Sequence, residues 1–145
     1  MSRYGSGAMA QELSGGCACG AIRYETSDDP IVMQNCHCSD CRKASGSGYA
    51  AIIFVPKDAV KLRGEARFYG VLGSSGKMVE RGFCPNCGSP VIEKAERLPN
   101  ALGIPAGSLD DPALYKPSMD LHTDSAPPWD VMLPDTKKFP IGRSA

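Results

Sequence analysis

The 145-residue sequence has no excess charge of either sign, few aromatic residues and no long apolar run. Its 16 lysine and arginine residues balance 16 aspartate and glutamate residues, and aromatic residues make up 7% of the chain. Binding to nucleic acid or to an anionic membrane surface needs a basic patch, and single strands are also bound by stacking on aromatic side chains. The composition therefore argues against both partners and favours a small one.

The chain also lacks the roughly 18 consecutive apolar residues of a membrane span. Its beginning, MSRYGSGAMAQELSGG, has no apolar stretch of the kind found in a signal peptide. We therefore expect a cytoplasmic protein. The length and the 42% hydrophobic content suit one domain with one core. We expect this domain at residues 13–145, after a flexible arm at residues 1–12 that is small, polar and without periodicity.

Turn-forming residues are abundant, with 16 glycines and 12 prolines. They separate short apolar or alternating runs, which is the pattern of a mainly β domain. Long helices tolerate neither residue well, so we expect helical structure only as short turns after Pro56 and Asp111. The expected strands lie at residues 21–26, 31–36, 49–55, 66–72, 77–84, 90–94 and 101–107.

Seven cysteines form three groups, and clustered thiols in a cytoplasmic protein favour metal or redox chemistry over disulfides. The segment CPNC places Cys84 and Cys87 on a turn with zinc-knuckle spacing. Cys17 and Cys19 stand at i and i+2 at the head of an expected strand, where alternate side chains share a face. These four thiolates would close one tetrahedral, structural zinc site.

The remaining thiols, Cys36, Cys38 and Cys41, lie in the stretch NCHCSDC. Three protein ligands with one open position are typical of catalytic zinc. The same spacing also allows a closed site in which His37 or His122 is the fourth ligand. Alternatively, two of the three thiolates could join Cys84 and Cys87 and leave Cys17 and Cys19 free, or the three thiols could form a redox cluster without metal. The residues alone leave these alternatives open.

The order of several motifs resembles the glutathione-dependent formaldehyde-activating enzyme family, which also includes centromere protein V. The motifs are GGCACGAIRY, CHCSDCRKASG, FCPNCGSPV, AGSLDDP and LPDTKKF, with His122 and Trp129 between the last two. The resemblance implies a β-tent of small antiparallel sheets and two zinc ions per chain. It assigns a structural ion to Cys17, Cys19, Cys84 and Cys87, and a catalytic ion to Cys36, Cys38 and Cys41.

The resemblance further implies that glutathione is joined to formaldehyde, a reaction classed as a carbon–sulfur lyase in reverse. We therefore expect a zinc-dependent lyase acting on a small thiol and a small aldehyde. Arg42 and Lys43 directly follow the trio and could clamp a substrate carboxylate, although surface cations usually need no special role. The alternative function is a non-catalytic, zinc-scaffolded binding module.

Other polar and aromatic residues have simpler expected roles. His37 lies between two ligands, so an extended backbone would point its side chain away from the metal, and we expect it to be packed. Asp110 and Asp111 precede a proline and are expected to form a turn or a cap. Trp129 is expected in the core or at its rim. A redox enzyme resembling the zinc-bearing methionine sulfoxide reductases would need a reactive cysteine in the C-terminal half. No cysteine follows Cys87, so the sequence argues against this function.

Overall fold

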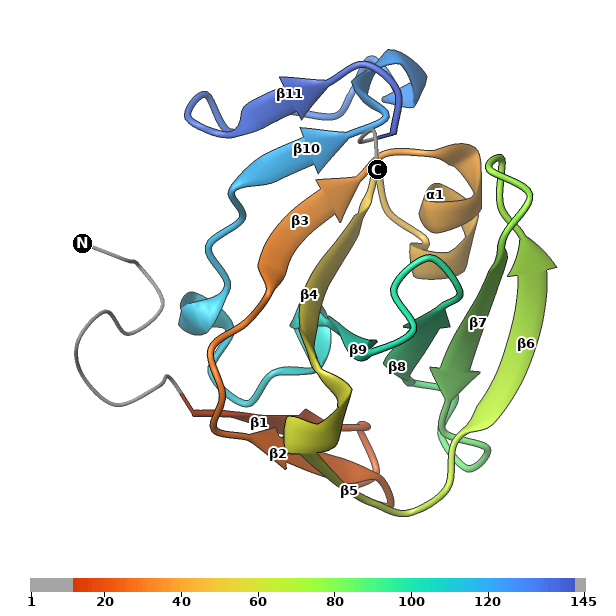
Figure 1. The fold of residues 1–145 in the computed structure, drawn as a ribbon, viewed down its shortest axis with the longest axis vertical. Helices are drawn as coiled ribbons and strands as arrows, with labels where there is room; N and C mark the ends of the chain where they lie inside the picture. The colour runs from red at the N-terminus through yellow and green to blue at the C-terminus, as the bar shows by residue number, and fades with distance from the viewer. Residues whose placement is uncertain (1–11, 143–145) are drawn as a thin grey trace.

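The computed structural model describes residues 12–142, which form two β-sheets, one α-helix and several short 3₁₀ turns (Figure 1). The expected mainly β fold of antiparallel sheets is confirmed. No helix in this range is long and apolar enough to span a membrane. The expected arm at residues 1–12 lies almost wholly outside the described residues, and the single domain at residues 13–145 stays a prediction.

The smaller sheet joins three short antiparallel strands in the order β1–β2–β5. They are β1 (Leu13–Gly16), β2 (Arg23–Thr26) and β5 (Val60–Arg63). Leu13 and Tyr24 are buried in one hydrophobic cluster with residues of the larger sheet. A Cβ at Gly15 would collide with the Tyr24 ring and the Ser108 carbonyl, so the glycine lets the segment at Ser108 approach the sheet.

The larger sheet has eight strands in the order β11–β10–β3–β4–β9–β8–β7–β6. They are β3 (Val32–Cys36), β4 (Ala50–Pro56), β6 (Arg67–Leu72), β7 (Met78–Phe83), β8 (Pro90–Ala95), β9 (Ala101–Pro105), β10 (Met119–Leu121) and β11 (Lys137–Phe139). All pairings are antiparallel except those of β10 with β3 and with β11. Each expected strand is present, and four short strands, β1, β5, β10 and β11, were not expected.

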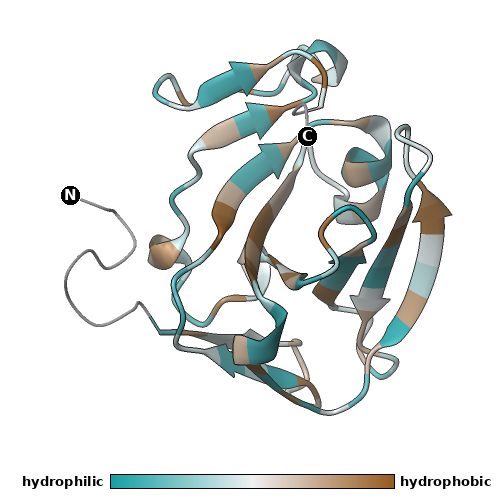
Figure 2. Ribbon diagram, viewed as in Figure 1, coloured by the Kyte–Doolittle hydropathy of each residue, from teal (hydrophilic) through white to brown (hydrophobic). Residues whose placement is uncertain are grey.

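Strand β4 runs through the centre of the molecule and separates two hydrophobic clusters. Figure 2 shows hydrophobic residues concentrated along this strand. Ile53 and Val55 are buried in the cluster that faces the small sheet. Ile52 and Phe54 point to the opposite side and are buried in the cluster that contains Cys41. The alternation of a strand therefore places one cysteine group on the face opposite the small sheet.

One helix, α1 (Ser39–Ser45), follows β3 directly. The Cys38 sulfur accepts the Cys41 N–H at 3.3 Å as the N-cap, and Gly46 ends the helix with φ 70°. The sequence did not predict this helix. The 3₁₀ turns are η1 (Lys57–Ala59), η2 (Ala106–Ser108), η3 (Pro112–Leu114) and η4 (Thr123–Ser125), so the helical turns expected after Pro56 and Asp111 are confirmed.

Candidate metal centres

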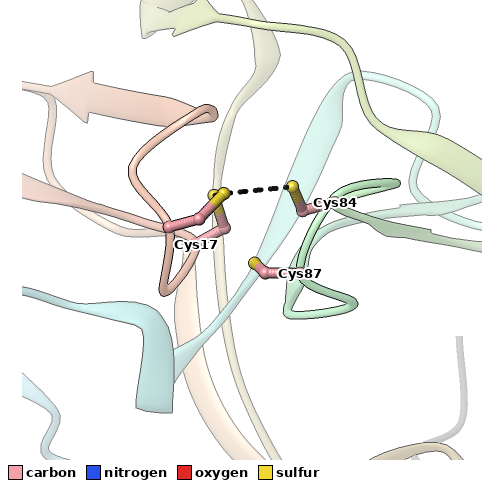
Figure 3. A group of neighbouring side chains, drawn as sticks. Cys17, Cys84 and Cys87 are labelled. Carbon is pink, nitrogen blue, oxygen red and sulfur yellow. Dashed lines mark hydrogen bonds between the residues drawn. The ribbon is translucent and has the colours of Figure 1, made fainter.

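The four-cysteine group lies where two turns meet. Cys17 and Cys19 belong to the turn between β1 and β2, and Cys84 and Cys87 to the turn between β7 and β8 (Figure 3). The expected position of the first pair at the head of a strand is wrong. The Gly20 N–H bonds the Cys17 carbonyl at 3.1 Å, and Gly20 has φ 79°, so the chain turns before the strand begins.

The four sulfurs are spaced as the ligands of one tetrahedral ion would be. All lie within 4.8 Å of one another. The Cys17 and Cys19 sulfurs are 3.6 Å apart, and those of Cys19 and Cys84 are 3.8 Å apart. Zinc–sulfur bonds of about 2.3 Å give a tetrahedron edge of about 3.8 Å, whereas a disulfide needs about 2.05 Å. All seven cysteines of the chain are free thiols, which agrees with the metal interpretation.

Uncharged donors of the two turns support thiolates at Cys17 and Cys87, whereas at Cys84 the backbone hydrogen bond from Cys87 lowers the pKa less than burial and the contacts with Cys17 and Cys87 raise it. The Ile22 N–H donates to the Cys17 sulfur at 3.2 Å, and this bond lowers the pKa of Cys17. The Cys87 sulfur lies 3.2 Å from the Ser89 hydroxyl, which lowers the pKa of Cys87 to about 5. Cys17 and Cys84 are buried, whereas Cys19 and Cys87 are exposed. The group is thus a closed set of four sulfurs near the surface.

The three-cysteine group lies at the junction of β3 and α1. Cys36 ends β3, Cys38 caps the helix and Cys41 lies in its first turn. Their sulfurs are within 4.8 Å of one another, and within residues 12–142 no histidine, aspartate or glutamate joins them at that spacing. Neither His37 nor His122 is therefore placed as a fourth ligand. The group is also separate from the four-cysteine group.

The three thiols do not all ionise readily without a cation. Hydrogen bonds from Cys36 and Cys41 lower the pKa of Cys38. The bond to Cys38 raises the pKa of Cys36 to about 11, and its contacts with Cys36 and Cys38 raise the pKa of Cys41. Charge therefore collects on one sulfur that two thiols stabilise. A divalent cation would remove the repulsion between three thiolates, so the trio suits a soft metal ion.

His37 is fully buried and points into a polar network, as expected of a packed histidine. Its Nε2 lies 2.7 Å from Asp120 Oδ1. Its Nδ1 lies 2.5 Å from Asp130 Oδ2, although the direction of that contact does not satisfy a hydrogen bond. Burial opposes ionisation of Asp120, but hydrogen bonds led by those from His37 and Thr136 outweigh it and lower its pKa. This network fixes the backbone between two of the three cysteines.

A cavity of about 500 Å³ opens on the three-cysteine group. The cations in its wall are Lys77, Arg81 and Arg97, and His122 also lines it. The residues lining this cavity do not include Arg42 or Lys43. Sequence reasoning missed the three cations because they come from β7, β8 and the adjoining loops, and only strand pairing brings them near the trio.

The remaining candidates lie outside this cavity wall. Asp111 caps η3 by accepting the Ala113 N–H at 3.1 Å, which confirms its capping role. Asp110 instead pairs with Arg23, with Nη1 at 2.9 Å and Nη2 at 2.5 Å from its two carboxylate oxygens. Trp129 is 68% exposed, so it is a surface aromatic and not a core residue.

The fold and the two sulfur groups define a mainly β protein with two sites that could hold metal ions. The model of the glutathione-dependent formaldehyde-activating enzyme family matches residues 12–125. The chain therefore belongs to this family, as its motifs predicted.

Individual proteins agree with this membership. A Halomonas elongata protein that carries the family's name is 34% identical over 128 residues, covering 81% of this chain and 78% of its own. A Schizosaccharomyces pombe protein described as an uncharacterized lyase is 31% identical over 78 residues, covering 54% of each chain. The crystal structure of a Rhodobacter sphaeroides protein superposes with a TM-score of 0.53 and 22% identity, over 67% of this chain and 87% of that one. This last likeness supports the fold.

Proposed function

We propose that this chain is a zinc-dependent carbon–sulfur lyase that joins a small thiol such as glutathione to formaldehyde or a related aldehyde. One observation carries the proposal: three sulfurs converge without a fourth ligand from residues 12–142 and face a cavity. Structural zinc sites are closed by four protein ligands, and catalytic sites keep one position open. Family membership and the lyase description of one relative support the reaction class.

The two groups would hold one zinc ion each, because thiolates are soft ligands that favour this metal over magnesium or calcium. Cys17, Cys19, Cys84 and Cys87 would hold the structural ion, and Cys36, Cys38 and Cys41 the catalytic one. When bound there, zinc would favour the thiolate form of a thiol substrate near pH 7.

The cavity suits a thiol of tripeptide size with carboxylate groups. Its volume of about 500 Å³ is within the range of small-molecule sites. Lys77 and Arg97 are exposed, so each can meet a carboxylate in water at the cavity mouth. Arg97 also lies over the Phe54 ring, with 5.9 Å to the ring centroid, which limits the directions of its guanidinium. We therefore assign the clamp expected of Arg42 and Lys43 to Arg97 and Lys77.

The partners in this proposal are a small thiol and a small aldehyde. The cytoplasmic location and the exclusion of nucleic acid and membrane partners stay predictions from the composition. Cys38→Ser serves as the inactive control, and Arg67→Ala serves as an active one because Arg67 is exposed on β6 and does not line this cavity.

Exchange NMR of glutathione and formaldehyde at equilibrium tests the proposal. We expect wild-type protein and Arg67→Ala to accelerate exchange between free glutathione and its hydroxymethyl adduct, and Cys38→Ser to leave it at the uncatalysed rate. An exchange rate that wild-type protein does not change would remove this pair of substrates and favour a binding module.

A further inference from the structure

Arg81 contacts the three-cysteine group directly. Its Nη2 donates to the Cys41 sulfur at 3.7 Å. The Arg81 side chain is 23% exposed and lines both the 500 Å³ cavity and a second cavity of about 790 Å³ next to it. A cation is thus held where the trio meets open space.

Glu93 holds this arginine from the neighbouring strand. The two residues are direct partners in the pairing of β7 with β8, so their side chains project from the same face. Glu93 Oε2 lies 3.8 Å from Arg81 Nε, and the Glu93 side chain is only 12% exposed. Burial raises the pKa of Glu93, and the positive charge of Arg81 opposes that shift. The carboxylate therefore depends on the arginine that it positions.

Two features of the local backbone affect the position of the Arg81–Glu93 pair. A Cβ at Gly103, on the other side of Glu93, would lie 3.1 Å from the Glu93 Cβ and 3.2 Å from the Phe54 ring. The register of β7 against β8 shifts between Gly82 and Phe83, immediately after Arg81. Such irregularities turn side chains toward functional sites. The Arg81–Glu93 pair therefore lies beside this register shift, with both charges in the cavity wall.

The guanidinium has donors left over for a ligand. Arginine carries five N–H groups. One of them donates to Cys41 and one points toward Glu93, so three remain available. No further ion pair or side-chain hydrogen bond of Arg81 occurs among the described residues. Arginine also stays protonated throughout the physiological range, so it supplies a permanent donor and not an acid.

From these contacts we infer that Arg81 is a catalytic residue that donates hydrogen bonds to the carbonyl oxygen of the aldehyde, and that Glu93 is its positioning residue. This inference rests on the proposed function. The thiol releases its proton to solvent, and a sulfur electron pair forms the carbon–sulfur bond. The carbonyl π pair moves to oxygen, and the resulting alkoxide takes a proton from solvent. Arg81 stabilises the negative charge that develops on that oxygen.

The inference separates the binding of the thiol from the chemistry of the aldehyde. Arg97 and Lys77 would act on the Michaelis constant of glutathione, whereas Arg81 would act on the rate of carbon–sulfur bond formation. Removing one oxyanion donor typically lowers kcat by about 100-fold to 1,000-fold. Removing a group that only orients a functional residue typically costs about 10-fold to 100-fold.

The test compares the wild type with Arg81→Ala, Arg81→Lys and Glu93→Gln, with Arg67→Ala as the matched control on the same hairpin. Exchange NMR gives kcat and the Michaelis constant for glutathione, and elemental analysis gives zinc per chain. We expect Arg81→Ala to lower kcat by about 100-fold or more, with the Michaelis constant changed less than about threefold and zinc content unchanged. Arg81→Lys should recover part of kcat, because lysine keeps the positive charge but lacks the planar guanidinium with its paired N–H donors.

Chemical rescue distinguishes a missing donor from a damaged site. Millimolar guanidinium chloride should raise kcat of Arg81→Ala and leave that of Glu93→Gln unchanged, because only the first variant has an empty guanidinium position. A wild-type enzyme that is active while Arg81→Ala and Arg81→Lys keep full kcat would overturn the inference and leave the proposed function standing. Loss of one zinc ion with the loss of kcat would also overturn it, because Arg81 would then support the metal. A wild type that is inactive would overturn both.

Discussion

The two cysteine groups use the same ligand atom but lie in different surroundings. The four-cysteine group joins two turns, and its supporting donors are an uncharged backbone N–H and a serine hydroxyl. The three-cysteine group lies between a strand end and a helix start, with an arginine at one sulfur and a cavity in front. Four sulfurs can supply all the ligands of a tetrahedral metal ion, whereas three leave one position for a ligand from outside the group.

This difference also shows in what holds each group in place. The turns at Cys17 and Cys84 are short and are closed by their own backbone hydrogen bonds. The three-cysteine group instead depends on polar contacts from other parts of the fold: the buried pair of His37 and Asp120 behind it, and Arg81 and Glu93 beside it. The four-cysteine group is thus held by turns that each close locally, whereas the three-cysteine group is supported by side chains from distant strands.

The largest effect is expected at the closed group, for Cys84→Ser. Structural zinc contributes about 10 kcal/mol or more of apparent binding free energy, which is as large as the whole stability of a typical domain. We expect this variant to be unfolded and to have lost the structural zinc, as seen by circular dichroism and elemental analysis. A Cys84→Ser protein with native circular dichroism would contradict a structural role of the group.

The next effect is expected for the polar network behind the open group, in Asp120→Asn. Asparagine removes the carboxylate that His37 and Thr136 contact in a buried network, and breaking a buried hydrogen-bonded partner typically costs about 1–3 kcal/mol. Denaturant unfolding should show this loss, with zinc affinity of the open group about 10-fold to 100-fold weaker. The control is Asp124→Asn, because Asp124 is exposed in the segment after β10. Equal stability of the two variants would show that the network does not support the site.

Cys38→Ser is expected to change stability little and activity completely. A serine can still cap α1, so the free energy of unfolding should fall by only about 1 kcal/mol. Zinc content should fall from two ions per chain to one, with native circular dichroism. A cysteine-to-serine substitution is thus expected to unfold the protein in the four-cysteine group and to leave it folded but inactive in the three-cysteine group. If Cys38→Ser unfolded like Cys84→Ser, both sites would be structural and the comparison would fail.

The smallest effect concerns the contact between the small sheet and the segment before η3, where Asp110 pairs with Arg23 and accepts from Ser14. The bond with Arg23 lowers the pKa of Asp110 from 3.8 to about 2. Its contribution to stability is therefore present above the ordinary pKa and is lost as the pH falls from about 4 toward 2. Asp110→Asn should be slightly less stable than wild type at neutral pH and equal to it near pH 2. A difference in denaturation midpoint that is constant over this range would exclude the ion pair as its source.

Local sequence signals predicted each cysteine pair of the four-cysteine group and most of the fold, whereas the meeting of the two pairs is long-range, because Cys19 and Cys84 are 65 residues apart. Alternating runs between glycines and prolines located the seven expected strands to within two residues. The knuckle spacing placed Cys84 and Cys87 on a turn. The sequence does not predict helix α1 because its N-cap is a cysteine. Helices usually begin with serine, threonine, aspartate or asparagine at this position.

The parts that the sequence could not predict depend on long-range pairing. His37 and its partner Asp120 are 83 residues apart, and Arg81 lies 40 residues from Cys41. Strands β10 and β11 have only three residues each, which is too short for an alternating pattern. Proximity in sequence to the trio favours Arg42 and Lys43, but strand pairing places other cations in the cavity wall.

Cadmium NMR of the protein loaded with cadmium in place of zinc tests the central claim, that one sulfur group is closed and the other open, most directly. We expect two cadmium resonances, of which Cys38→Ser removes one. Added glutathione should shift that same resonance and leave the other unchanged, because only the trio has a position for an external thiol. If neither resonance moved, or if the resonance of the four-cysteine group moved instead, the assignment of an open site to Cys36, Cys38 and Cys41 would be contradicted.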